Sequence, residues 1–162
     1  MELVEGIATV DDVDEFVARL DEIATGHGST VQAFDARYVV DREHLELAVD
    51  LAERERERGE AIVDDESVEI LLYAAGRRQI DRALEMGVSE GDCPVVVVVV
   101  GGAEDGAADD IREMLTPADT LGEHDPDRVR SFFDVSEREL AVTDGTLEDV
   151  IRERVAMLVV ER

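Results

Sequence analysis

Six consecutive valines at residues 95–100 constrain the fold more than any other feature of the sequence. They follow a Cys-Pro pair and precede two glycines, so the apolar run ends at a turn signal. A β-branched run without polar alternation is typical of a strand that is buried on both faces. The run is also far shorter than the about 20 residues that a membrane-spanning helix needs. It therefore predicts the central strand of a sheet that is covered on both sides.

Most of the remaining chain carries apolar residues at helical spacing between polar starts and glycine stops. Shorter apolar stretches with β-branched residues predict further strands at residues 2–10 and 29–40. Asp41 is expected to cap one helix and Ser67 another, and Gly76 is expected to separate two helices. The predicted helices cover residues 11–28, 41–60, 64–76, 77–88, 105–115, 125–135, 136–141 and 146–162. This pattern predicts a single domain over residues 1–162 of the α/β class, with α+β as the alternative, in which several helices cover a small mixed sheet of three or four strands.

The charge of the chain is strongly one-sided. Asp and Glu together number 42, Lys and Arg together number 16, and each of those 16 is an arginine. The formal net charge of −26 is spread over all segments rather than gathered in one block. Such a surface fits a protein adapted to molar salt, where the Debye length falls to about 3 Å and self-repulsion is screened. The alternative is an acidic surface for a basic partner.

Features of the N-terminus and of cysteine usage predict where the protein works. The first residues contain neither a basic segment nor a long apolar stretch, so we expect no signal peptide. The single cysteine, Cys93, has no partner for an internal disulfide, which fits a reducing compartment. We therefore expect a cytoplasmic protein.

The sequence contains no recognisable catalytic or metal-binding pattern. His27, His44 and His124 do not share the spacing of a zinc site, and no serine lies in a nucleophile-elbow motif. His44 stands near a predicted helix start, which favours a packed ring or a local hydrogen bond over a general base. We therefore expect no catalytic residue, no metal and no cofactor.

One turn resembles the layout of a phosphate-binding loop, in which a strand, a glycine-rich turn and a helix follow one another. Gly101, Gly102 and Gly106 do not match a dinucleotide or P-loop spacing, and four acids crowd the turn. A plain strand-to-helix turn is the favoured interpretation. A small cytosolic nucleotide-binding enzyme or sensor that uses this turn is the alternative function.

A basic island stands out against the acidic background. The stretch "YAAGRRQIDRAL" at residues 73–84 has a formal charge of +2, because three arginines face the single acid Asp81. Arginine presents a planar fork that fits phosphate and stacks on bases, and Gln79 can both donate and accept hydrogen bonds. The alternative is structural: the arginines pair with local acids such as Asp81 and Glu85 and have no ligand.

The C-terminal segment carries a wide apolar face. Leu147, Ile151, Val155 and Leu158 recur at helical spacing along residues 147–159. This face either packs against the rest of the fold or docks a partner protein.

Four blocks of the sequence resemble the smallest conserved subunit family of the KEOPS (EKC) complex. They are "VQAFDARYVVDREHLELAV", "SVEILLYAAGRRQIDRALEMGV", the apolar strand that follows, and "LEDVIRERVAMLVVE". Their order and spacing agree with the family over most of the chain. The pattern from Leu71 to Gly87 is the most specific of the four.

The resemblance implies a non-catalytic subunit with no small-molecule substrate of its own. It implies binding to the atypical kinase or ATPase subunit of the complex and support of threonylcarbamoyladenosine modification of tRNA. For archaeal members it also implies binding of tRNA, chiefly at the single-stranded 3′ CCA end. The motif and the chemistry together predict an RNA-binding site formed by Gly76, Arg77, Arg78, Gln79 and Arg82. The kinase-binding residues are predicted to be Leu147, Ile151, Val155 and Leu158. A purely structural adaptor without RNA contact is the remaining alternative.

Overall fold

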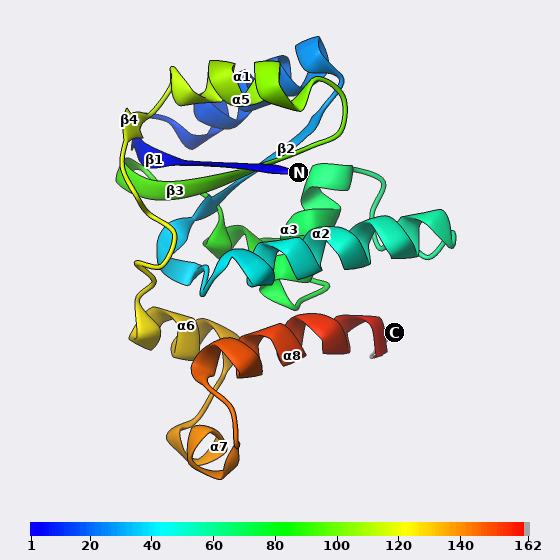
Figure 1. Cartoon of the computed structure of the whole chain (residues 1–162), viewed down its shortest axis with the longest axis vertical. Coiled ribbons are helices and arrows are strands. Elements are labelled where there is room, and N and C mark those ends of the chain that lie inside the picture. Colours follow the sequence, from blue (N-terminus) through cyan, green and yellow to red (C-terminus); the bar gives the residue numbers. More distant parts are fainter. Residues whose placement is uncertain (161–162) are drawn as a thin grey trace.

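The computed structural model describes residues 1–160, which form a four-stranded sheet covered by helices on both faces (Figure 1). The strands are β1 (Glu2–Val10), β2 (Thr30–Asp35), β3 (Gly91–Val100) and β4 (Thr116–Pro117). The helices are α1 (Val13–His27), α2 (Arg42–Glu57), α3 (Glu66–Ala75), α4 (Ile80–Ala83), α5 (Glu104–Arg112), α6 (Pro126–Phe133), α7 (Glu137–Val142) and α8 (Leu147–Val160), with short 3₁₀ turns η1 (Ala36–Tyr38) and η2 (Leu84–Met86). The predicted fold class is confirmed.

The sheet has the order β2-β3-β1-β4, and its three pairings are all antiparallel. The expectation of a mixed sheet is therefore wrong. β1 and β2 do run in the same direction, but β3 lies between them and is antiparallel to both. Residues 1–160 therefore form no parallel strand pair.

The valine run is the centre of the sheet, as predicted. Residues 95–99 are fully buried, and alternate valines enter two separate cores. Val95, Val97 and Val99 pack with α1 and α5, whereas Val96 and Val98 pack with α2 and α3. The alternation follows from the pleat, which directs successive side chains to opposite faces.

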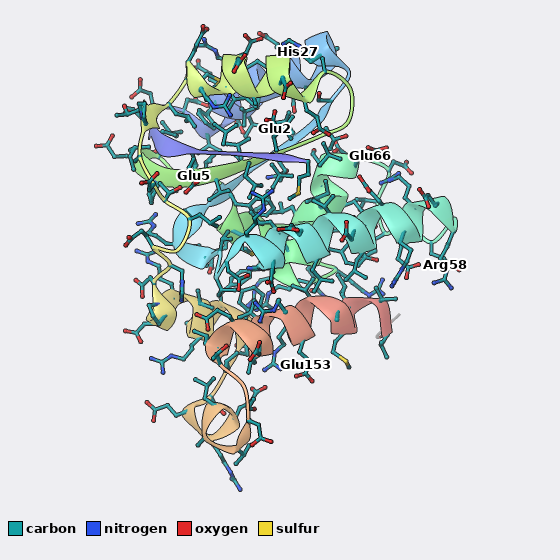
Figure 2. All side chains as sticks on the ribbon, in the orientation of Figure 1. Glu2, Glu5, His27, Arg58, Glu66 and Glu153 are labelled. Carbon is teal, nitrogen blue, oxygen red and sulfur yellow. The ribbon has the colours of Figure 1, made fainter. Side chains whose placement is uncertain are left out.

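Two helical layers lie on one side of the sheet and one on the other (Figure 1). α1 and α5 cover one face; α2 and α3 cover the opposite face, and α6 and α8 pack beneath α2 and α3. α7 projects from the far end and contains no buried residue. Acidic side chains point outward from most elements, as Glu153 on α8 illustrates (Figure 2).

Aspartates begin most of the longer helices by accepting backbone N–H bonds. Asp41 caps α2 as predicted, accepting from the His44 N–H at 2.8 Å. The predicted cap Ser67 is wrong, because Asp65 caps α3 and accepts from the N–H of both Ser67 and Val68. Asp35 ends β2 five residues before the predicted end at residue 40, because its carboxylate accepts from the Arg37 N–H and turns the chain into η1.

The connection from β4 to α6 is fixed to the sheet by buried polar contacts. The Glu5 carboxylate on β1 accepts from the N–H groups of Thr120 and Leu121 at 3.0 and 2.7 Å. The buried Thr120 hydroxyl donates to the Val95 carbonyl oxygen at 2.7 Å. These bonds position α6, and hence Phe132 and Phe133, beneath α2 and α3.

Candidate functional site

Gly76 forms a tight turn at the end of α3. Its φ of 63° lies in the left-handed region, and the following Arg77 N–H bonds to the Leu72 carbonyl oxygen at 3.1 Å. A Cβ atom at this position would lie 3.3 Å from the Arg154 carbonyl oxygen of α8. Glycine therefore serves both the backbone conformation and the close approach of α3 to α8, and the predicted break between two helices is confirmed.

Arg77 extends from this turn to the C-terminal end of α6. Its guanidinium donates to the Phe132 carbonyl oxygen, lies 3.6 Å from the Asp134 carboxylate, and sits over the Phe132 ring at 4.8 Å from the centroid. The side chain is only 16% exposed. A cation at a helix C-terminus also interacts favourably with the helix dipole. Arg77 therefore joins α3 to α6.

Arg78 makes the equivalent connection to α8. Its guanidinium donates to the Leu158 carbonyl oxygen at 3.1 Å, in the last turn of that helix. From the other direction, Arg154 on α8 donates to the carbonyl oxygen of Phe133 at 3.3 Å and pairs with Glu139 at 2.7 Å. We call Arg77, Arg78 and Arg154 the arginine brace, because together they hold α3, α6 and α8 at one corner.

The brace contradicts the structural alternative, in which the arginines pair with local acids, whereas the predicted RNA contact of Arg77 and Arg78 stays a prediction. Neither Arg77 nor Arg78 pairs with Asp81 or Glu85 within residues 1–160. Both side chains are half-buried, and the Nε atoms of both are buried without an acceptor there. Replacing both by alanine will consequently affect the fold as well as any ligand contact.

The other predicted residues of the island face solvent. Gln79 precedes α4 and makes no capping bond with its side chain, and Arg82 on α4 is exposed. The Arg82 guanidinium has no hydrogen bond or ion pair within the part of the chain that the structure describes. Ile80 lies between them and is 43% exposed. The corner therefore presents a polar amide, an unpaired guanidinium and an apolar side chain together. Sequence reasoning did not select Ile80 as a contact, although the motif contains it.

The predicted second helix of this region is much shorter than expected. Residues 77–88 form only the single turn of α4 and then η2, which ends at Met86 with Gly87 as its C-cap. Ala83 and Met86 are buried, whereas Ile80, Leu84 and Glu85 are exposed. A segment anchored by only two side chains packs too little apolar surface to support a long helix.

The apolar face of α8 packs inward. Ile151, Val155 and Leu158 are buried in the same core as α2 and α3, and Leu147 is partly buried against it. The prediction that Ile151, Val155 and Leu158 contact a partner is therefore wrong for this arrangement, because their side chains already fill the core. The large apolar residues that α8 leaves exposed are Met157 at 39% and Val160 at 72%.

The glycine-rich turn after β3 is filled by the protein's own groups. The Glu104 carboxylate accepts from the Gly101 N–H at 2.7 Å, and it also pairs with the N-terminal amine. The Gly101 bond lowers the pKa of Glu104. A Cβ atom at Gly102 would lie 2.4 Å from the His27 carbonyl oxygen, and one at Gly106 would lie 2.8 Å from the His27 ring. Close packing thus accounts for these glycines, and a carboxylate occupies the position that a phosphate would need.

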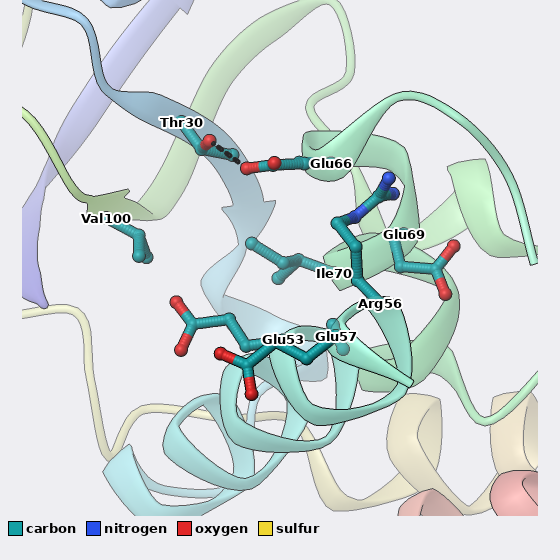
Figure 3. A pocket seen from close by; sticks show the side chains of 9 residues that line it. Thr30, Glu53, Arg56, Glu57, Glu66, Glu69, Ile70 and Val100 are labelled. Carbon is teal, nitrogen blue, oxygen red and sulfur yellow. Dashed lines mark hydrogen bonds between the residues drawn. The ribbon is translucent and has the colours of Figure 1, made fainter. Parts of the chain in front are cut away.

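A cavity of about 370 Å³ opens beside α2, α3 and the ends of β2 and β3 (Figure 3). Glu53, Glu57 and Glu66 line it, and the Thr30 hydroxyl donates to Glu66 at 2.9 Å. Burial, followed by the charges of neighbouring acids, raises the pKa of Glu53. Arg56 is the single cation that lines the cavity among the described residues, and its guanidinium donates to the Val63 carbonyl oxygen at 2.8 Å. This lining disfavours a phosphate-bearing ligand.

We also searched residues 1–160 for a metal site, a reactive cysteine and a membrane-spanning helix. No group of three or more His, Cys, Asp or Glu side chains there is arranged to hold a metal ion. Cys93 is buried as a free thiol. No helix in this range has both the length and the apolar character that crossing a bilayer requires.

Comparison with known proteins identifies the family. A family model described as kinase binding protein CGI-121 matches residues 10–158. The chain belongs to this family. The family is that of the small kinase-binding KEOPS (EKC) subunit, so the resemblance read from the four sequence blocks is confirmed. No curated protein is detectably similar to the chain.

Proposed function

We propose that the chain is a non-catalytic accessory subunit of KEOPS that binds the atypical kinase or ATPase subunit and the 3′ CCA end of tRNA. In this role it supports threonylcarbamoyladenosine modification of tRNA. Membership of a kinase-binding family supports the contact with the kinase subunit. The observation that supports the contact with tRNA is the exposed corner formed by Gln79, Ile80 and Arg82 beside the turn at Gly76.

The chemistry of this corner suits unpaired nucleotides. The Arg82 guanidinium has no hydrogen-bond or ion-pair partner within residues 1–160, so it is free to stack on a base or to bind phosphate bidentately. Gln79 can donate to and accept from a base edge, and Ile80 offers an apolar contact. These interactions depend less on counterion release than simple charge attraction does, so they suit binding in strong salt. The arginine brace serves this site by fixing the turn that presents it.

Binding of tRNA at high salt tests the RNA contact. Fluorescence anisotropy compares intact tRNA with tRNA that lacks its CCA end, for the unchanged protein and for Gln79→Ala and Arg82→Ala. We expect intact tRNA to bind more tightly than the truncated form, and each substitution to weaken binding by about fivefold or more. Arg138→Ala is the matched control, because Arg138 is also exposed and without an ion pair in the described chain but lies on α7.

Equal affinity of all proteins for both tRNAs would refute the RNA contact at this corner. If the kinase subunit binds while neither tRNA does, the chain is a structural adaptor. A calorimetric signal with common nucleotides would instead favour the nucleotide-binding alternative, which the occupied turn after β3 does not support.

We place the kinase contact on the outer side of α8. Met157 and Val160 are the large apolar residues that this helix leaves exposed, and they lie in or next to the turn to which Arg78 donates. Val160→Glu is expected to reduce co-purification of the KEOPS kinase subunit at least tenfold without lowering stability, because the side chain is 72% exposed. Val142→Glu, at a 77% exposed position on α7, is the matched control. Unchanged capture by Val160→Glu and by Met157→Glu would remove the contact from this surface.

A further inference from the structure

The sheet leaves one long strand at its edge. β2 pairs with β3 alone within residues 1–160, so one side of β2 has no neighbouring strand there. The opposite edge is the two-residue strand β4, which ends in a proline and offers little for pairing. An exposed edge strand is a template for an additional strand. β2 is therefore the position at which this sheet can be extended.

A groove runs beside β2 between α1 and α3. It encloses about 510 Å³ and is lined mainly by apolar side chains from α1, β2, α3 and η2. Leu20, Val31 and Leu71 form buried parts of its lining. Val17 on α1 and Leu84 of η2 also line it, although they are 42% and 57% exposed. Two of the six large apolar residues exposed among residues 1–160 thus belong to one groove.

The charged groups that line the groove among residues 1–160 are acidic. Asp14 and Asp21 on α1 and Asp65 before α3 line it, and none of the three forms an ion pair within the described residues. Burial, together with the charge of Asp65, raises the pKa of Asp21. The side-chain amide of Gln32 also lines the groove and donates to the Ala33 carbonyl oxygen of the same strand at 2.8 Å. The groove therefore combines three carboxylates without an ion-pair partner in residues 1–160, of which Asp65 also caps α3, with a strand carbonyl oxygen that the Gln32 amide already bonds.

We propose that this groove binds an extended basic and apolar peptide segment of a partner protein, which adds a strand to the free edge of β2. Successive side chains of a strand point to opposite faces, so consecutive apolar residues of the peptide contact Val17 on the α1 side and Leu84 on the α3 side. Arginine or lysine residues on either side of them face Asp14, Asp21 and Asp65. The acids repel phosphate, so a peptide fits the groove better than RNA does. This interaction is independent of the proposed tRNA and kinase contacts.

A labelled peptide of the sequence Gly-Arg-Val-Ile-Val-Arg-Gly tests the proposal by fluorescence anisotropy with the full chain. Two matched peptides separate the contributions. Replacing Ile by Pro removes the central backbone donor, and replacing both Arg by Glu reverses the charge. We expect saturable binding of the parent peptide and at least about tenfold weaker binding of either matched peptide.

Protein variants locate the site. Val17→Glu and Leu84→Glu place a charge in the groove at exposed positions and are expected to weaken binding of the parent peptide about tenfold or more. Val142→Glu on α7 should bind as the unchanged protein does. Amide hydrogen exchange should slow at residues 30–35 when the peptide is bound, because an added strand pairs with β2.

Several results would overturn the proposal. They are the absence of saturable binding, equal binding of the proline peptide, or unchanged exchange at residues 30–35 in the complex. Displacement of the peptide by the trinucleotide CCA would assign the groove to RNA instead. The two matched peptides keep the test decisive even if a groove variant fails to fold.

Discussion

Acidification is expected to destabilise the fold through His44. The imidazole is fully buried; its Nε2 donates to the Ala74 carbonyl oxygen at 2.8 Å, and its Nδ1 accepts from the Val40 N–H at 3.3 Å. The ring also meets Phe133 edge-on, with 5.8 Å between the centroids. His44 thus connects the start of α2 to the end of α3, two residues before the turn at Gly76. Its protonation state bears on the candidate site for this reason.

Burial lowers the pKa of His44 from 6.5 to about 4, because desolvation disfavours the imidazolium. The unfolded chain therefore takes up a proton near pH 6.5, whereas the folded chain does so only near pH 4. Stability from the neutral ring is fully present above pH 6.5 and declines as the pH falls towards 4. At pH 4.5 the unfolded imidazole is almost fully protonated and the folded one about a quarter protonated. The free energy of unfolding is therefore expected to fall by about 2.5 kcal/mol between pH 7.5 and 4.5 through this ring alone.

Guanidinium chloride unfolding at constant high ionic strength measures this loss. The free energy of unfolding is determined from pH 7.5 to 4.5 for the unchanged protein and for His44→Gln, which cannot titrate. Carboxylates also titrate in the lower part of this range, so the informative quantity is the difference between the two curves. His27→Gln, at a half-buried surface histidine paired with Asp110, is the matched control. Superimposable pH dependences of the unchanged protein and His44→Gln would refute the reasoning.

Three further substitutions test contacts around the site by thermal or denaturant unfolding. Gly76→Ala is expected to lower the free energy of unfolding by about 1–2 kcal/mol, because alanine must adopt a left-handed backbone and its Cβ lies near the Arg154 carbonyl oxygen. An unchanged free energy of unfolding would contradict the turn described at Gly76. Arg77→Lys is expected to lower the free energy of unfolding by about 1–2 kcal/mol, since a single ammonium cannot reproduce both the bond to the Phe132 carbonyl oxygen and the contact with the Phe132 ring. A stability equal to that of the unchanged protein would show that a positive charge alone is enough to hold α3 against α6. Glu69→Gln is expected to lower the free energy of unfolding by about 2 kcal/mol, because this buried carboxylate accepts three bonds of 2.9–3.0 Å from the backbone N–H groups of Ile62 and Val63. Unchanged stability would show that the loop between α2 and α3 does not need the negative charge.

The sequence by itself determined the local elements and the family. The valine run specified a strand buried on both faces, since apolar β-branched residues without alternation leave no polar face. Asp41 and Gly76 marked helix boundaries because their chemistry acts on adjacent backbone groups. The four motif blocks identified the family that the match to residues 10–158 confirms. Each of these inferences depends on residues close together in the chain.

Only the tertiary structure decided what the long side chains contact. Arg77 and Arg78 carry the same charge as Arg82 and lie within a few residues of it. Arg77 and Arg78 nevertheless bond to neighbouring helices, whereas Arg82 faces solvent. Their acceptors, the carbonyl oxygens of Phe132 and Leu158, are backbone groups that leave no sequence signal. The apolar face of α8 was equally ambiguous, because a periodic stripe looks the same whether it meets the protein's own core or a partner. Long-range packing resolved both cases, since it alone determines which surfaces are already covered.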